Sequence, residues 1–415
     1  MTNPRTSTLQ LILGSRFYRS AFVALFVSGV AMSATMPQLT LFLVRDLGAS
    51  LPVAGLYYLT NLAAPVAGYL IGRWSDRRSD RLGLFRLCSL AGGLGWLAMA
   101  VSTEIWMPFV VSAVALSISG ASMAQLFAAS RDELSRRPTG GADNRVLSAV
   151  RMAFTAGWVV GPVLGSWFAS QFGLRALLVA TAICTVVQVL PLGRQRVHRY
   201  LPPGHDASTA PSPAVTRRMV PLLVFTGLCV LAMSGDTIKF GYLPLYMADE
   251  LGIADTVRGA VIAVQPLLEL ALMPFFARFA DRYGALRVMV LGAALGTGAN
   301  LAFAMSTTVL GLFAGQLLTA GLWAALGALG VSIAQHLYPE GVATASGVFL
   351  SSITVGAAAG GLIGGLGVSR LGLPEVFYLP AALSAVATVG LLLLERRLRV
   401  TAPTSERRPV VAGRA

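Results

Sequence analysis

Arg73-Trp74-Ser75-Asp76-Arg77 follows one long apolar run of the chain, and Arg278-Phe279-Ala280-Asp281-Arg282 follows another in the second part of the sequence. The resemblance extends upstream of both copies. Asp46-Leu47-Gly48 precedes the first copy, and Asp249-Glu250-Leu251-Gly252 precedes the second at a similar spacing. Repetition over so long a period indicates two related halves, each built from the same series of elements.

The composition indicates that these elements are membrane spans. Of the 415 residues, 55% are hydrophobic and only 12% are charged, and the mean hydropathy is +0.70. Charged residues make up about a quarter of an ordinary soluble domain. Apolar stretches of about 20 residues, each long enough to cross a ~30 Å hydrocarbon core, recur along most of the chain. The sequence therefore predicts an all-α membrane protein.

We predict twelve transmembrane helices in two pseudo-symmetric six-helix bundles. The expected spans are 20–44, 51–72, 84–102, 106–128, 146–170 and 174–193 in the first half, and 219–247, 257–277, 285–305, 309–337, 341–368 and 375–395 in the second. The corresponding segments are a cytoplasmic N-terminal segment (1–19), the first half (20–193), a polar, proline-containing linker (194–218), the second half (219–395) and a cytoplasmic tail (396–415).

The distribution of positive charge predicts the orientation. Of the 32 Lys and Arg residues, 26 belong to the even-numbered connections, the linker and the two termini, whereas the odd-numbered connections hold only Arg45, Arg175, Arg258 and Arg370. Positive residues stay on the cytoplasmic side. Both termini are therefore expected in the cytoplasm of a bacterium, with the spans in its inner (plasma) membrane. The net charge of +14 is spread over short loops and forms no basic face for nucleic acid.

The loop after the second span resembles a motif of a known family. Gly72-Arg-Trp-Ser-Asp-Arg-Arg78 is similar to the loop between the second and third helices of the major facilitator superfamily, and Arg278 to Gly284 is similar to its weaker copy. A carboxylate near a helix end among arginines can form a charge-assisted latch between helices, although ordinary positive-inside loops would also contain these residues. The expected latch residues are Gly72, Asp76, Arg77, Asp80, Arg81, Asp281 and Arg282.

The fifth span contains Gly157, Gly161, Pro162 and Gly165. Small residues four apart let helices approach closely, and a proline inside a helix bends it. The pattern resembles the motif that superfamily exporters carry in their fifth helix, which implies export. Glycine-mediated helix packing with no bearing on direction is the alternative.

A narrower resemblance is to bacterial sugar efflux transporters of the SET family. Residues 75–81, Ser-Asp-Arg-Arg-Ser-Asp-Arg, are similar to that family's Ser-Asp-basic-x-Gly-Asp-Arg loop, with serine in place of glycine. Further matches are Gln125, Ser130 to Glu133, Arg151, Trp158 to Pro162 and Leu268-Glu269. The resemblance implies sugar export. The seventh span departs from the family's pattern at Asp236 and Lys239, which leaves the substrate and the coupling mechanism open.

Charged side chains inside membrane spans are costly and therefore mark candidate sites. Asp236 and Lys239 are three residues apart and can pair on one helix face, and Gln265 and Glu269 share a face in the eighth span. Desolvation favours a neutral carboxyl group and a nearby cation favours the ionised one, so Glu269 is our candidate for proton coupling, together with Asp236 and Lys239. Direct hydrogen bonding of Glu269 to a sugar and a static ion pair are the alternatives.

A sugar site requires amide or charged groups for the hydroxyls and an aromatic face for the C–H surface. The candidate substrate-binding residues are Gln38, Asn61, Gln125, Arg151, Trp158, Gln265, Gln316 and Trp323. Polar residues in spans also join helices to one another, and Arg151 is close enough to a span end to snorkel to the surface.

The sequence predicts a monomeric transporter whose partners are a small-molecule substrate, protons and the lipid bilayer. We expect export of sugars or glycosides by alternating access, driven by proton influx. The alternatives are a multidrug or natural-product exporter of the same fold and, disfavoured by the fifth-span motif, a sugar uptake symporter. We find no nucleotide motif, no metal-ligand cluster and no convergent catalytic groups in the sequence, and therefore expect neither a cofactor nor enzymatic activity.

Overall fold

The computed structural model describes residues 12–77, 80–136, 143–197 and 219–401. The elements of the first half are α2 (Arg16–Leu41), α3 (Leu51–Leu56), η2 (Tyr57–Leu62), α4 (Ala63–Arg77), α5 (Arg81–Ala100), α6 (Trp106–Val111), η3 (Ser112–Leu116), α7 (Ser117–Arg136), α8 (Asp143–Phe172) and α9 (Leu174–Val187). Those of the second half are α10 (Val220–Leu245), α11 (Asp255–Tyr283), α12 (Ala285–Met305), α13 (Val309–Leu337), α14 (Val342–Leu371) and α15 (Tyr378–Thr401).

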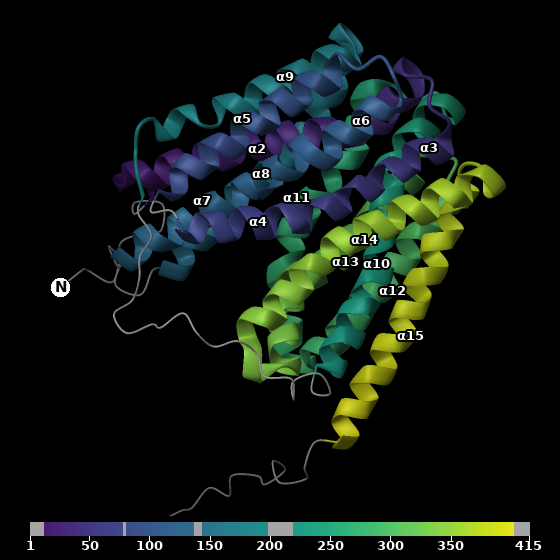
Figure 1. The fold of residues 1–415 in the computed structure, drawn as a ribbon. Helices are drawn as coiled ribbons and strands as arrows, with labels where there is room; N and C mark the ends of the chain where they lie inside the picture. Colours follow the sequence, from purple (N-terminus) through teal and green to yellow (C-terminus); the bar gives the residue numbers. More distant parts are fainter. Residues whose placement is uncertain (1–11, 78–79, 137–142, 198–218, 402–415) are drawn as a thin grey trace, which may run out of the picture.

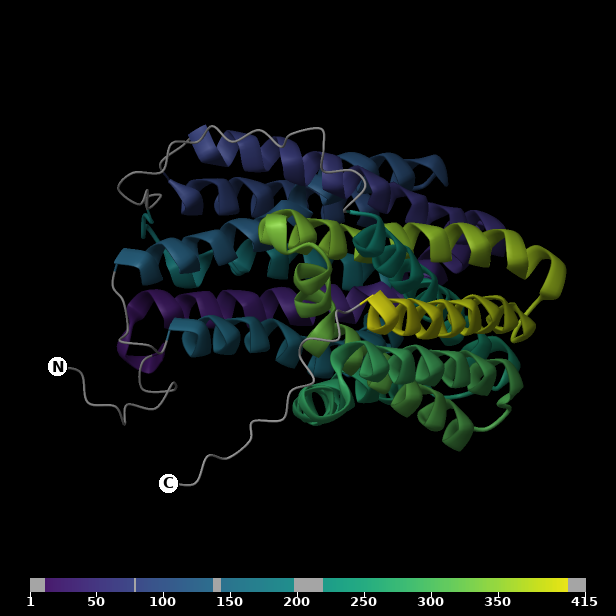
Figure 2. The same ribbon diagram turned by 90° about the horizontal axis from the view of Figure 1, so that it is seen from below.

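Within these described ranges, eleven helices are long and apolar enough to cross a membrane. The other predicted span, Leu51–Arg77, is an unbroken helical run of α3, η2 and α4. Its apolar content is lower because its centre carries Tyr57, Tyr58, Thr60 and Asn61. Two of these, Tyr58 and Asn61, face a cavity between the halves. The described residues thus form the predicted twelve spans in two six-helix groups. Figures 1 and 2 show the two groups as layers, the first coloured purple to teal and the second teal-green to yellow.

The repeat in the sequence is also a repeat in the backbone. Helix α2 continues into a π-helical turn, η1 (Phe42–Asp46), and α10 continues into another, η6 (Tyr246–Glu250). Each turn is followed by a glycine with a positive φ angle, 68° at Gly48 and 60° at Gly252. This left-handed region costs a glycine nothing because it has no Cβ. The first span of each half therefore ends in the same way.

Each half has its own hydrophobic core. In the first half Phe17, Phe85 and Leu126 are almost fully buried and belong to one cluster. In the second half Phe225, Met289 and Phe349 belong to another cluster, and the rings of Phe225 and Phe349 are stacked with centroids 6.1 Å apart. Because each core is formed within one bundle, the two bundles can move relative to each other without losing it.

The two halves meet mainly through α2 with α10, α8 with α11, and α3–η2 with α14. Figure 1 shows α4 and α14 diverging from this last contact. We call the end of the bundle that carries Arg16 and Thr401 the terminal end, and the other the opposite end. The halves are in contact at the opposite end and separate toward the terminal end.

Candidate functional site

A cavity of about 370 Å³ lies between the halves, roughly midway along the helices. Helices α2, η2 and α8 line it from the first half, and α10, α11, α13 and α14 line it from the second. Pockets for small molecules typically measure about 300–1,000 Å³. The lining residues are Met32, Met36, Tyr58, Asn61, Phe154, Thr155, Trp158, Met233, Asp236, Thr237, Phe240, Gln265, Pro266, Glu269, Trp323, Ile353 and Ala357.

A continuous hydrogen-bonded chain of polar side chains lies on the second-half wall of this cavity. The Lys239 ammonium donates to Asp236 Oδ1 at 2.6 Å and to Gln265 Oε1 at 2.7 Å. Gln265 Nε2 in turn donates to Glu269 Oε2 at 3.2 Å. Trp323 Nε1 completes the chain by donating to Asp236 Oδ1 at 3.2 Å. The chain joins α10, α11 and α13, and the predicted pairing of Asp236 with Lys239 is confirmed.

The charges in this chain are unequal. Lys239 is 1% exposed and contributes one positive charge, whereas Asp236 and Glu269 are two carboxyl groups at the cavity surface. Lys239 is bonded directly to Asp236 but reaches Glu269 only through the amide of Gln265. If both carboxylates were ionised, the group would carry a net negative charge in apolar surroundings, which is unfavourable. One proton on Glu269 would make the whole group neutral.

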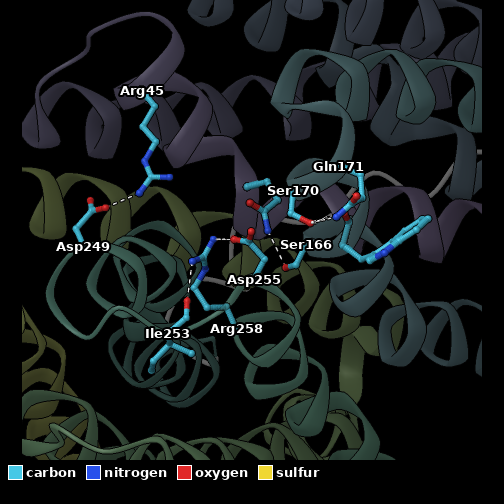
Figure 3. Close-up of polar contacts among 10 residues, drawn as sticks. Arg45, Ser166, Ser170, Gln171, Asp249, Ile253, Asp255 and Arg258 are labelled. Carbon is cyan, nitrogen blue, oxygen red and sulfur yellow. Dashed lines mark hydrogen bonds and ion pairs between the residues drawn. The ribbon is translucent and has the colours of Figure 1, made fainter.

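The contacts that close the opposite end lie just beyond the cavity. The Tyr242 hydroxyl donates to the Leu51 carbonyl oxygen at 3.0 Å. A Cβ on Gly365 would lie 2.8 Å from the Pro52 carbonyl oxygen, so α14 and α3 touch backbone to backbone. At the surface Arg45 forms an ion pair with Asp249, which joins the ends of the first spans of the two halves (Figure 3).

The start of α11 adds to this closure. A Cβ on Gly259 would lie 2.8 Å from the carbonyl oxygen of Pro162, so α11 packs tightly on α8. Next to it, Arg258 donates to the Ile253 carbonyl oxygen at 2.8 Å and pairs with Asp255, as Figure 3 shows. The glycine permits the helix contact, and the arginine fixes the preceding loop.

Four of the eight candidate substrate-binding residues line the cavity, namely Asn61, Trp158, Gln265 and Trp323. Trp158 Nε1 is buried and has no hydrogen-bond partner in the part of the chain that the structure describes. Arg151 belongs to α8, but its side chain lies outside the described residues.

Three predicted residues lie away from the cavity. Gln38 donates to Ser166 Oγ at 2.8 Å and joins α2 to α8. Gln125 accepts from Ser75 Oγ at 2.6 Å and joins α7 to α4. Gln316 is fully buried in α13, and neither amide atom has a partner among the described residues. Sequence alone does not distinguish an amide that bonds helices from one that faces a ligand.

The predicted latch residues take several different positions. Asp80 caps α5, because its Oδ1 accepts the Leu82 amide at 3.2 Å, a typical helix N-cap. Arg81 donates to Asp132 Oδ2 at 3.1 Å and to Ser75 Oγ at 2.6 Å, so it joins α5, α7 and α4 inside the first half. Gly72 lies in α4, and a Cβ added to it would meet no atom within 4 Å.

The two latch residues at the end of α11 make no contact with the first half in the described part of the structure. Asp281 and Arg282 are exposed at the end of α11, where the Arg282 guanidinium lies 5.4 Å from the centroid of the Tyr283 ring. The side chains of Asp76 and Arg77 lie outside the described residues. Among the described latch residues of the first half, Arg81 makes a charge-assisted contact, its ion pair with Asp132.

The fifth-span glycines pack against the first span. A Cβ on Gly157 would lie 2.6 Å from the Phe26 carbonyl oxygen, one on Gly161 would lie 2.7 Å from the Val30 carbonyl oxygen, and one on Gly165 would lie 2.7 Å from Ala34 Cα. Ser33 Oγ also donates to the Gly157 carbonyl oxygen at 3.2 Å. The motif therefore holds α8 against α2, and the Pro162 backbone then contacts α11 across the halves.

The sequence did not single out most of the apolar lining. Eleven residues not predicted to line the cavity do so, namely Met32, Met36, Tyr58, Phe154, Thr155, Met233, Thr237, Phe240, Pro266, Ile353 and Ala357. Their spacing offers a partial signal: Phe154 and Trp158 are one helical turn apart, as are Met233, Asp236 and Phe240. An apolar residue in a span gives no sign of whether it faces lipid or a cavity.

Comparison with known proteins identifies the family. The family model described as Major Facilitator Superfamily matches residues 21–238 and again 224–414, once for each half. The chain belongs to the Major Facilitator Superfamily. It is 27% identical to Sugar efflux transporter A of Dickeya chrysanthemi over 383 residues, covering 89% of this chain and 94% of that protein. It is also 24% identical to Multidrug resistance protein MdtG of Proteus mirabilis, covering 86% and 90%.

Solved structures give the same fold. The crystal structure of the nucleoside transporter NupG superposes with a TM-score of 0.72 at 16% identity, covering 92% of this chain and 98% of that one. At this identity the likeness concerns the fold alone. The superfamily predicted from the loop motifs is confirmed, and the chain is a bacterial multi-pass membrane transporter.

Proposed function

We propose that this protein exports neutral sugars or glycosides across the bacterial inner membrane by alternating access, and that each export cycle is coupled to proton influx. The observation that carries the proposal is the chain Asp236–Lys239–Gln265–Glu269 on the wall of a cavity between two halves. One cation faces two carboxyl groups, so a proton on Glu269 changes the net charge of the group from −1 to zero. The relatives named as sugar efflux transporters support the substrate class.

In this proposal the terminal end faces the cytoplasm, and the closed opposite end faces the periplasm. The excess of arginine at the terminal end supports this orientation. The conformation is then the inward-facing one, in which a monomer would take up substrate from the cytoplasm. Protonation of Glu269 from the periplasmic side would favour the return of the empty carrier, because a neutral group is easier to enclose than a charged one.

Everted membrane vesicles test the coupling directly. Vesicles that contain the protein should accumulate radiolabelled lactose or glucose when respiration acidifies their lumen, and vesicles without the protein should not. A protonophore that collapses the gradient should abolish the accumulation. Accumulation that persists after the gradient has collapsed would refute proton coupling and would leave sugar transport itself standing.

Export of drug-like cations or neutral hydrophobic compounds is the second candidate. It is favoured by relatives named as multidrug resistance proteins and by the apolar share of the cavity lining, which includes Met32, Phe154 and Ile353. The same vesicles should be offered ethidium beside the sugars. Accumulation of ethidium without any sugar would assign the protein to drug export.

A further inference from the structure

A second cavity, of about 270 Å³, lies inside the first half. We call it the side chamber. It is bounded by α2, η2, α4, α5, η3, α7, α9 and Gln188 just after α9, so its lining belongs to one bundle. It shares Met32, Met36, Tyr58 and Asn61 with the central cavity, and the two spaces therefore lie side by side with these four side chains between them.

The polar residues that line the side chamber, among apolar ones, are all neutral. Its described lining contains no Asp, Glu, Lys or Arg, in contrast to the central cavity with its two carboxyl groups. Trp96 adds an aromatic surface. The hydroxyl- and amide-bearing residues of the lining are Ser28, Tyr57, Tyr58, Asn61, Ser112, Ser117, Ser119, Ser122, Thr181, Thr185 and Gln188.

Some of these groups already have partners in the protein. Ser112 Oγ lies 2.7 Å from Thr60 Oγ1, Thr181 Oγ1 lies 2.5 Å from Thr35 Oγ1, and Gln188 donates to Ser89 Oγ at 3.2 Å. These bonds join neighbouring helices. Part of the polar lining therefore serves to join helices, as serine and threonine commonly do in membrane proteins.

Four others are different. Ser28, Asn61, Ser119 and Ser122 line the chamber without a side-chain hydrogen bond to any residue in the described ranges. They come from α2, η2 and α7, so they surround the space on several sides. A polar group inside a membrane protein costs free energy if it finds no partner. Four such groups around one space call for a ligand or water that supplies hydroxyl groups.

We propose that the side chamber is a binding subsite for a neutral polyhydroxylated ring, the sugar unit of the substrate. Its many hydroxyl partners, its Trp96 surface and its lack of charged lining residues match a pyranose, whereas a carboxylate or ammonium group would lose its hydration without gaining a counter-charge. This inference rests on the proposed sugar export.

Gly120 allows the chamber to be filled without a steric clash. It lies in α7 on the chamber lining, and a Cβ added there would meet no atom within 4 Å. Gly120→Leu should therefore fold normally and occupy part of the space. Gly227→Leu is the matched control, because Gly227 is also a helical glycine whose Cβ would meet nothing within 4 Å, and it lines neither cavity.

The measurement is the dissociation constant of radiolabelled glucose and lactose for the purified protein, with thermal unfolding as a check on the fold. Gly120→Leu should weaken binding at least about tenfold, whereas Gly227→Leu should bind like the wild type. The double variant Ser119→Ala/Ser122→Ala, which removes two hydroxyls without adding volume, should also weaken binding by about tenfold. Glucuronate, a similar ring with a carboxylate, should bind at least about tenfold more weakly than glucose.

The outcomes separate the two proposals. If the wild type binds neither sugar, the proposed function fails and the subsite fails with it. If the wild type binds sugar but Gly120→Leu and the double serine variant bind it equally well, the chamber holds water only and the subsite is refuted, while sugar export stands. Equal binding of glucuronate and glucose would refute the assignment to neutral rings.

Discussion

The hydroxyl of Tyr242, in α10, donates a hydrogen bond to the carbonyl oxygen of Leu51, in α3, with 3.0 Å between the two oxygens. The two residues belong to different halves, and the bond lies on the opposite-end side of the central cavity. Tyr242 is 2% exposed and also contacts Gly55, which faces Gly365 of α14. This bond is therefore among the contacts that must break when the opposite end opens.

Tyr242→Phe should shift the protein toward the state that is open at the opposite end. The change removes one hydrogen bond, of about 0.5–1.5 kcal/mol, which corresponds to a shift of about two- to tenfold. Spin labels at Thr103→Cys and Thr307→Cys, with the native cysteines replaced, report the separation of the halves at that end. Tyr246→Phe is the control, because its hydroxyl donates to Ser306 within the second half. An unchanged distance distribution in Tyr242→Phe would contradict a closing role.

Gly365→Val should have a larger effect in the same direction. The new side chain would meet the Pro52 carbonyl oxygen at 2.8 Å from its Cβ, and overpacking of this kind costs about 1–3 kcal/mol. Because the clash exists only while α3 and α14 are in contact, it destabilises the closed opposite end in particular. The same label pair should show the open distance, and transport should slow. Gly347→Val, also in α14 but with no atom near its Cβ, should leave both unchanged.

The fold could be predicted from the sequence because it depends on long-range averages. Twelve apolar runs and a repeated loop are properties of many residues, and single exceptions do not alter them. The break in the second span illustrates the limit. Tyr57 to Leu62 form a 3₁₀ segment. Its sequence does not predict this change of helix type, since it contains neither glycine nor proline. The segment matters because it carries Tyr58 and Asn61 to both cavities.

The site could be predicted only in part, and the amides show why. Gln38, Asn61, Gln125 and Gln265 are all polar residues in apolar spans. Gln38 and Gln125 bond neighbouring helices away from the cavity. Asn61 and Gln265 face the cavity, and Gln265 is also bonded to Lys239 of the neighbouring α10. The need for a partner follows from the apolar surroundings, but the identity of the partner depends on packing. The side chamber is harder to predict, because its lining is drawn from seven elements, none of which contributes more than five residues.

The Lys239 pair gives a prediction about stability. Lys239→Met should destabilise the protein by about 3 kcal/mol, at the low end for a broken buried pair because Asp236 keeps 21% exposure. The double variant Asp236→Asn/Lys239→Met removes both charges and should recover most of the loss. Thermal unfolding of the detergent-solubilised protein measures both. Equal destabilisation by the single and double variants would mean that Lys239 is needed for its packing instead of its charge.

Glu269→Gln tests the coupling group. Glutamine resembles the protonated carboxyl group, so the hydrogen-bonded chain with Asp236 and Lys239 would stay neutral throughout the cycle. The proton gradient could then no longer drive transport, because no proton would bind or leave at this position. Proton-driven accumulation of labelled sugar in everted vesicles should fall to the level of empty vesicles. Sugar exchange, in which unlabelled sugar inside the vesicles drives entry of labelled sugar, should persist because it needs no net proton movement.

Glu104→Gln is the matched control for this variant, since Glu104 is an exposed carboxylate in the loop between α5 and α6. It should keep both gradient-driven accumulation and exchange. Loss of exchange together with accumulation in Glu269→Gln would show that Glu269 binds the sugar directly. Full retention of gradient-driven accumulation would place coupling elsewhere. Asp236 would then be the next carboxyl group to test, because it lies on the same cavity wall and is bonded directly to Lys239.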